Sequence, residues 1–237
     1  MRFTISAVTA TALFLSSMGI AQDQPAAGKK ELQQRVAELK QSMAANQAKL
    51  KKYQWLQTTQ VSIKGEEKKE TRAQCRYGAD GKVEKTPVGP PEQPKEMPGG
   101  LRGKIAKKKI AEMQGYTERL KSLISHYAPP NPQRIQSAMQ AGNVKLEAAP
   151  GQATLAVQNY YKQGDKLSFV FDTANKKLQS YNVDTYLDDP KKDIVTLTND
   201  FASLPDGTNY LHETVLDAQG KEIEIKTTNS GHSLIPQ

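Results

Sequence analysis

The sequence predicts an α+β protein: a curved antiparallel sheet of about eight to ten strands, an incomplete β-barrel-like meander, covered by helices. Two segments repeat apolar residues at the helical spacings of three and four. From about residue 150 onward, short runs alternate apolar and polar side chains, as strands with one wet face do. Such a sheet must bury its apolar face, and the helical segments are long enough to cover it.

Residues 1–21 have the features of a secretory signal peptide. Arg2 is followed by an uncharged, mostly apolar run from Ile5 to Met18, and Gly19 and Ala21 are small residues before a cleavage position. The run is shorter than the ~20 residues that span a bilayer, so cleavage is favoured over a membrane anchor. The sequence therefore predicts a periplasmic or secreted chain, cleaved near Ala21, with residues 22–237 forming one exported domain.

Composition narrows the classes of partner. The chain of 237 residues has a net charge of +8, and removal of Arg2 with the signal leaves +7. A basic protein outside the cytoplasm is expected to meet an anionic membrane surface, a cell-wall polymer, a lipid or a lipid-modified protein, and no nucleic acid. Cys75 is the single cysteine, which excludes an intramolecular disulfide and favours a buried thiol. The oligomeric state is left open.

The first helix is predicted over residues 29–53. Its apolar residues form one narrow stripe, interrupted by Asn46. This stripe either lies on the sheet or forms a short coiled-coil seam, and its length favours the sheet. The stripe consists of Leu32, Val36, Leu39, Met43, Leu50 and Tyr53.

Strands are predicted next, followed by a break and two central helices. Trp55, Val61 and Ile63 alternate with polar residues, and Cys75 falls on the apolar side of a second alternating run. Residues 86–103 hold five prolines and four glycines, which predicts a long loop. The central helices are expected at about 104–141, the first ending near Tyr127.

A basic run begins the first central helix and admits two interpretations. Lys104, Lys107 and Lys108 fall off the apolar stripe of that helix, as a solvated face would, whereas Lys109 falls on it. Together with Arg102 these residues are candidates for contact with an anionic surface.

Catalytic and metal-binding motifs are not evident. The sequence has no glycine-rich phosphate loop, no paired histidines at zinc spacing and no nucleophile elbow. Four aspartates around Pro190 suggest either a carboxylate pair or, preferably, a polar hairpin tip: Asp184, Asp188, Asp189 and Asp193. We therefore expect no metal and no cofactor. Enzyme activity is the least favoured class, and its best candidate site is this group of aspartates.

The order of elements resembles that of the periplasmic outer-membrane lipoprotein carrier and sorting superfamily. ELQQRVAELKQSMAANQAKLKKY is followed by WLQTTQVSIKG and ETRAQCRYGADGKVEK, and later by hairpins such as KLSFVFDTANKKLQSYNVDTYL. The resemblance covers residues 30–85 and 143–230. It implies an incomplete β-barrel closed by helices over an apolar cavity that holds acyl chains.

Two functions follow from these observations. One is an exported, non-enzymatic carrier of a lipid, acyl or other apolar ligand. The other is a structural or interaction protein of the cell envelope with a filled core. The apolar side chains expected on the inner face line a ligand cavity in the first case and form the core in the second; they are Trp55, Phe169, Phe171, Tyr181, Val183, Leu197 and Phe201.

Overall fold

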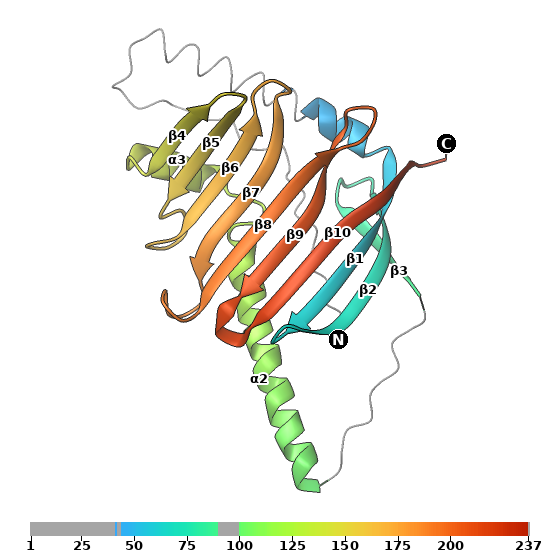
Figure 1. Cartoon of the computed structure of the whole chain (residues 1–237), viewed down its shortest axis with the longest axis vertical. Coiled ribbons are helices and arrows are strands. Elements are labelled where there is room, and N and C mark those ends of the chain that lie inside the picture. Colours follow the sequence, from blue (N-terminus) through green and yellow to red (C-terminus); the bar gives the residue numbers. More distant parts are fainter. Residues whose placement is uncertain (1–40, 42–43, 90–99, 237) are drawn as a thin grey trace.

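The computed structural model describes residue 41 and residues 44–89 and 100–236. These residues form one ten-stranded antiparallel sheet (Figure 1), which confirms the α+β class and the antiparallel sheet. The strands are β1 (Tyr53–Ile63), β2 (Glu66–Tyr77), β3 (Val83–Val88), β4 (Val144–Ala149), β5 (Gln152–Gln158), β6 (Lys166–Asp172), β7 (Lys177–Tyr186), β8 (Ile194–Ser203), β9 (Asn209–Ala218) and β10 (Ile223–Leu234). The helices with defined bounds are α2 (Gly100–Ser125), α3 (Pro132–Gln140) and the short 3-10 helix η1 (Gln219–Lys221).

The strand order across the sheet is β3-β2-β1-β10-β9-β8-β7-β6-β5-β4. Strands that follow one another in the sequence are neighbours in the sheet, except β3 and β4, and β1 lies next to β10. Tyr53 is opposite Leu234 at one end of this pair, and Ile63 is opposite Ile223 at the other. The sheet is open, with β3 and β4 at its edges.

The N-terminal helix is described only in part. Residues 44–50 are helical, whereas the rest of the predicted span from residue 29 lies outside the described residues, as does the signal peptide. The predicted end of this helix was wrong, because Tyr53 is the first residue of β1. Its backbone pairs with Leu234, and a continued helix would leave that partner in β10 unpaired.

The predicted loop at 86–103 is shorter than expected at both ends. Thr86, Pro87 and Val88 belong to β3, and the helix begins at Gly100. Proline is tolerated in β3 because this is an edge strand, paired with β2 alone. Residues 90–99 lie outside the described residues.

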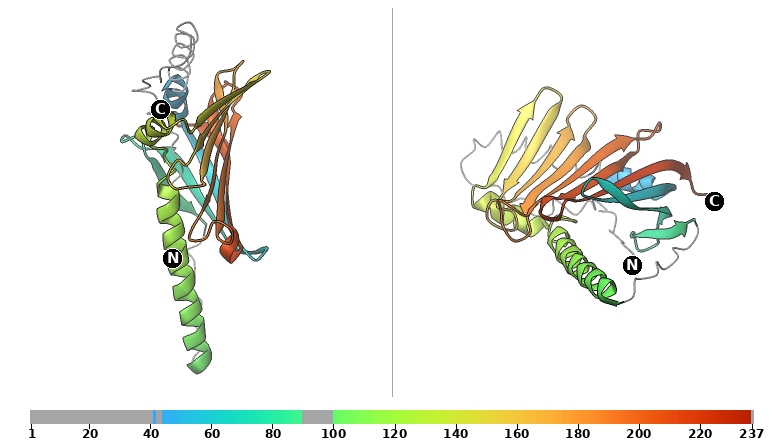
Figure 2. Two further views of the ribbon diagram at one scale, coloured as in Figure 1. Left: turned by 90° about the vertical axis from the view of Figure 1, so that its left-hand side faces the viewer. Right: turned by 60° about the horizontal axis from the view of Figure 1, so that its bottom comes forward.

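Helices α2 and α3 lie on the concave side of the curved sheet, as Figure 2 shows. The second half of α2 supplies Tyr116, Leu120 and Leu123 to the core, and α3 supplies Ile135. They pack with inward side chains of the strands from β5 to β10, such as Leu167. The first half of α2 extends beyond the sheet (Figures 1 and 2). Among the described residues, no helix is both long enough and apolar enough to span a membrane.

Candidate functional site

The seven predicted inner-face side chains do not form one group. Phe169, Tyr181, Val183 and Leu197 are buried in the main core, and Phe171 and Phe201 are partly buried against it. Trp55 is also buried, but it lies apart, where its ring contacts Tyr77 and His232.

The apolar part of the inner face packs against the helices. The phenyl ring of Phe169 lies 5.1 Å from the ring of Tyr181, and the Tyr181 hydroxyl donates a hydrogen bond to the backbone carbonyl of Tyr127, just after α2. Tyr116 and Leu120 of α2 belong to the same core. In this conformation the predicted ligand-binding residues, apart from Trp55, form part of a helix–sheet core. Their contact with a ligand stays a prediction.

Beside this core lies a polar region that the sequence analysis did not identify. The Gln57 amide nitrogen and the Trp55 indole nitrogen donate to the Asn229 side-chain oxygen, at 2.9 and 3.0 Å. Lys85 donates from Nζ to Gln57 Oε1 at 2.6 Å, and burial lowers the pKa of Lys85. Gln57 and Asn229 occupy inward positions in β1 and β10. A polar residue at an inward position of an alternating run is the sequence signal that could have identified this region.

A buried carboxylate joins the helices to the sheet. Asp165 is fully buried, and its Oδ2 accepts hydrogen bonds from the Tyr127 hydroxyl at 2.6 Å and from the backbone nitrogens of Tyr161 and Lys162 at 2.9 and 2.8 Å. Burial is the main cause of the raised pKa of Tyr127, and the bond to Asp165 raises it further. This arrangement fixes the chain where α2 ends.

The acidic residues around Pro190 serve separate contacts. Asp188 forms a salt bridge with Arg119, and Asp184 Oδ2 lies 3.9 Å from Lys166 Nζ. Asp189 accepts a hydrogen bond from the backbone nitrogen of Lys191. These contacts agree with a polar hairpin tip. Within the described part of the chain, no three His, Cys, Asp or Glu side chains are placed to share a metal ion.

Cys75 occupies the buried position that its strand pattern predicts. Its side chain is fully buried, and burial raises the pKa of its thiol. A raised pKa lowers the fraction of the reactive thiolate, so the thiol behaves as a small core side chain.

His232 gives the fold a pH-dependent element. Its ring stacks on Trp55 and lies 4.1 Å from the ring of Tyr210. Burial, with a smaller contribution from the nearby His212, lowers the pKa of His232 from 6.5 to about 4. The folded state therefore binds this proton less well than the unfolded state does.

The expected result is that stability from His232 is fully present above pH 6.5 and is lost as the pH falls toward 4. Allowing for partial exposure of the ring, this loss amounts to about 1–2 kcal/mol. Urea unfolding of the wild type and of His232→Gln at several pH values measures it, and the variant should depend less on pH across that window. Identical pH profiles would contradict the assignment.

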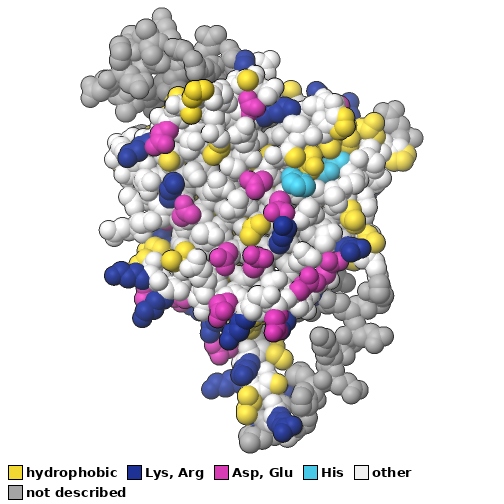
Figure 3. Space-filling view, in the orientation of Figure 1, with side chains coloured by type: hydrophobic (Ala, Val, Ile, Leu, Met, Phe, Trp, Pro, Cys, Tyr) yellow, Lys and Arg dark blue, Asp and Glu magenta, His cyan; other side chains and the backbone are white. Residues whose placement is uncertain are grey.

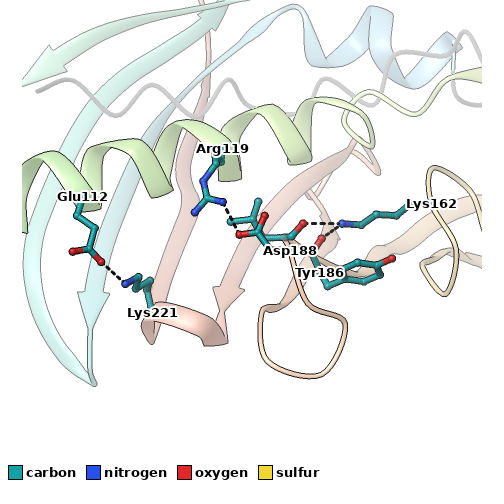
Figure 4. Close-up of polar contacts among 7 residues, drawn as sticks. Glu112, Arg119, Lys162, Tyr186, Asp188 and Lys221 are labelled. Atoms are coloured by element: carbon teal, nitrogen blue, oxygen red, sulfur yellow. Dashed lines mark hydrogen bonds and ion pairs between the residues drawn. The ribbon is translucent and has the colours of Figure 1, made fainter.

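Two salt bridges mark the place where α2 leaves the sheet. Arg119 Nη1 lies 2.5 Å from Asp188 Oδ2 in the β7–β8 loop, and Lys221 Nζ lies 2.6 Å from Glu112 Oε1 beside β10 (Figure 4). The hydrogen bond from Lys221 lowers the pKa of Glu112, and the charges of Lys108 and Lys109 lower it further. Both bridges are exposed, so they orient α2 more than they stabilise it.

Residues 100–111, which we name the projecting segment, precede these bridges. Twelve helical residues extend for about 18 Å. Ile105 and Ile110 are 52% and 45% exposed, and Figure 3 shows apolar and basic side chains together at this end of the molecule. The segment contains no Asp or Glu. Its five basic side chains are all exposed. They are the five candidates for contact with an anionic surface that the sequence analysis named: Arg102, Lys104, Lys107, Lys108 and Lys109.

From the sequence, Lys109 on the apolar stripe either extends its charge to solvent along an apolar surface or precedes the start of the helix. The helix begins before Lys109, and its side chain is exposed because no strand lies beneath this part of α2. The projecting segment is thus a basic helix end with two exposed isoleucines that extends beyond the sheet.

Comparison with known proteins adds no relative. No protein-family model, curated protein or solved structure matches the chain.

Proposed function

We propose that this chain is a non-enzymatic binding protein that docks on an anionic lipid surface through its projecting segment. The observation that carries the proposal is a helix end with five exposed cations, two exposed isoleucines and no carboxylate, lying beyond the sheet. An exported location, with cleavage near Ala21, is part of the same proposal and would place the protein beside such a surface.

The pattern of side chains favours lipid over a cell-wall polymer. At about 100° per residue, Ile105, Ala106 and Ile110 fall within an arc of about 140°, and Lys104, Lys107 and Lys108 lie outside it. An interfacial helix buries such an apolar arc at the boundary between headgroups and acyl chains. A polymer of sugars and phosphates would attract the cations but would not stabilise the isoleucines.

The remaining two cations fit the same geometry. Arg102 and Lys109 fall on the apolar side, where their long stems lie along apolar surface while the charges reach the headgroups. Each Lys or Arg near an anionic surface contributes about 1 kcal/mol, and this attraction decays within a Debye length of about 10 Å at moderate salt. Binding should therefore weaken steeply as salt is added.

Neutralising three lysines of the projecting segment tests the proposal. Lys104, Lys107 and Lys108, changed together to Gln, should weaken binding to phosphatidylserine-containing vesicles roughly a hundredfold at low salt, because about 1 kcal/mol is lost per charge. Vesicle co-sedimentation measures the partition, with neutral phosphatidylcholine vesicles as the comparison.

A matched control lowers the net charge equally at a distance from α2. It changes Lys51, Lys52 and Lys82, which are exposed, to Gln. This control should change the partition less than about threefold, because the removed charges lie far from the projecting segment and their attraction to the membrane is screened by salt. Equal losses in both triple variants, or wild-type binding that does not distinguish anionic from neutral vesicles, would contradict the proposal.

A second candidate function is the carriage of an apolar ligand, as the resemblance in element order implies. The observation that favours it is a curved, open sheet whose concave side, among the described residues, is covered by α2 and α3. A ligand there would take the place of α2 side chains, such as Leu120, that now share a core with Phe169 and Tyr181. Native mass spectrometry of protein purified without detergent, with organic extraction, tests it: a stoichiometric acyl species supports carriage, and a clean mass favours the filled core.

A further inference from the structure

The two edges of the sheet differ in how well they are protected against further pairing. The β3 edge contains Pro87, which cannot donate a backbone hydrogen bond. The β4 edge has the sequence VKLEAA, contains no proline, and is exposed at every position after Val144. Leu146, at its centre, is 54% exposed. An exposed edge of this kind is a template for another strand.

The backbone of β4 presents its free groups in a defined register. The backbone nitrogen of Gln158 donates to the carbonyl of Asn143 at 2.8 Å, so residue 143 faces β5. Backbone groups in a strand alternate in direction, and therefore Lys145 and Glu147 also face β5. The N–H and C=O groups of Val144, Leu146 and Ala148 point to the outer edge, where no described strand pairs with β4.

We propose that β4 pairs antiparallel with β4 of a second copy of this chain, about a two-fold axis at Leu146. In that register Leu146 is opposite its own copy and Val144 is opposite Ala148, which gives about six backbone hydrogen bonds. Lys145 is opposite Glu147 of the other copy, twice, on one face of the joined sheet. The two Leu146 side chains meet on the other face.

The sequence of β4 singles out a second copy as the occupant. Directly opposed residues share a face, and opposite charges there stabilise a pair of strands while like charges destabilise it. Reversed upon itself, VKLEAA places both charges of each copy opposite a partner of the other sign. The pairing depends on neither the projecting segment nor a ligand, so it stands independently of the proposed function.

The oligomeric states of the wild type and of two variants test the pairing. Sedimentation equilibrium of the whole chain, from micromolar to hundreds of micromolar concentrations, should show a monomer–dimer equilibrium for the wild type. Lys145→Glu places Glu opposite Glu147 at both ends and should raise the dimer dissociation constant at least about tenfold. The swap Lys145→Glu with Glu147→Lys restores opposite charges and should bring the constant back to within about threefold of wild type.

Folding of each variant is checked by far-ultraviolet circular dichroism. In β5 the residues opposite Lys145 and Glu147 are the uncharged Ala156 and Thr154, so the hairpin should tolerate all three sequences. A wild type that is monomeric at every concentration would overturn the proposal. So would a double swap that dimerises no better than Lys145→Glu, because the pairing would then not depend on this register.

Discussion

Replacement of Asp165 with alanine is expected to lower the free energy of unfolding by about 3–5 kcal/mol. The carboxylate accepts hydrogen bonds from the Tyr127 hydroxyl and from the backbone nitrogens of Tyr161 and Lys162, and alanine offers none of them an acceptor. A buried donor left without an acceptor costs about 1–3 kcal/mol. Chemical denaturation of the purified chain, followed by far-ultraviolet circular dichroism, measures the change.

Two further variants separate the hydrogen bonds from the charge. Asp165→Asn keeps an oxygen for the three donors and places its amide nitrogen at Oδ1, to which the described residues donate no hydrogen bond. We expect this variant to lose about 2–3 kcal/mol, because the bonds are no longer charge-assisted and the buried amide nitrogen has no described acceptor. Tyr127→Phe removes one donor and should lose about 1 kcal/mol. An alanine variant within 1 kcal/mol of wild type would refute the anchoring role of Asp165.

Leu120→Ala, in the packed half of α2, is expected to cost about 3 kcal/mol of stability. Leu120 is 2% exposed and lies in the core between α2 and the sheet. Truncation loses the transfer free energy of the buried methyl groups and leaves a cavity that its neighbours fill only in part. The midpoint of urea unfolding should fall without a change in the slope of the transition.

Ile105→Ala is the matched control in the projecting half of the same helix. Ile105 is 52% exposed, so its truncation should change stability by no more than about 0.5 kcal/mol. On anionic vesicles the order should reverse: loss of Ile105 should weaken partition about fivefold, equivalent to about 1 kcal/mol of apolar burial. Equal destabilisation by the two variants would show that the projecting half packs like the rest of α2.

Local patterns predicted the elements better than they predicted their neighbours. Alternation identified the strands around Phe169, Tyr181 and Leu197, because a half-buried strand needs apolar residues at every second position. The pairing of β1 with β10 was not predicted, because alternation is the same whichever strand lies alongside. Similarly, the apolar stripe of the first central helix predicted one helix but not that part of it extends past the sheet.

The candidate sites divide in the same way. The basic residues near Lys107 were identified because charge is visible in the sequence, whereas their exposure beside Ile105 and Ile110 depends on where the sheet ends. Asp165 and Asn229 were not identified, because a single polar residue in a strand or turn is usually solvated. Their importance comes from partners that are distant in sequence, such as Tyr127 and Trp55.

The neighbouring positions of β1 and β10 have a consequence for the synthesis of the chain. Read from the β4 edge, the strands run from β4 to β10 and then from β1 to β3, so the sheet is a simple up-and-down meander in circularly permuted order. At translation rates of about 5–20 residues per second, β1 leaves the ribosome roughly 10–30 s before β10, the strand with which it pairs.

A permuted gene would remove this delay. The backbone nitrogen of Ile235 donates to the carbonyl of Lys52 at 2.8 Å. A linker long enough to run back along the helix of residues 44–50, about 10 Å, could therefore join residue 236 to residue 44 in a chain that starts at Gly100. Every strand would then follow its own neighbour in the sheet, and the lower contact order would speed folding.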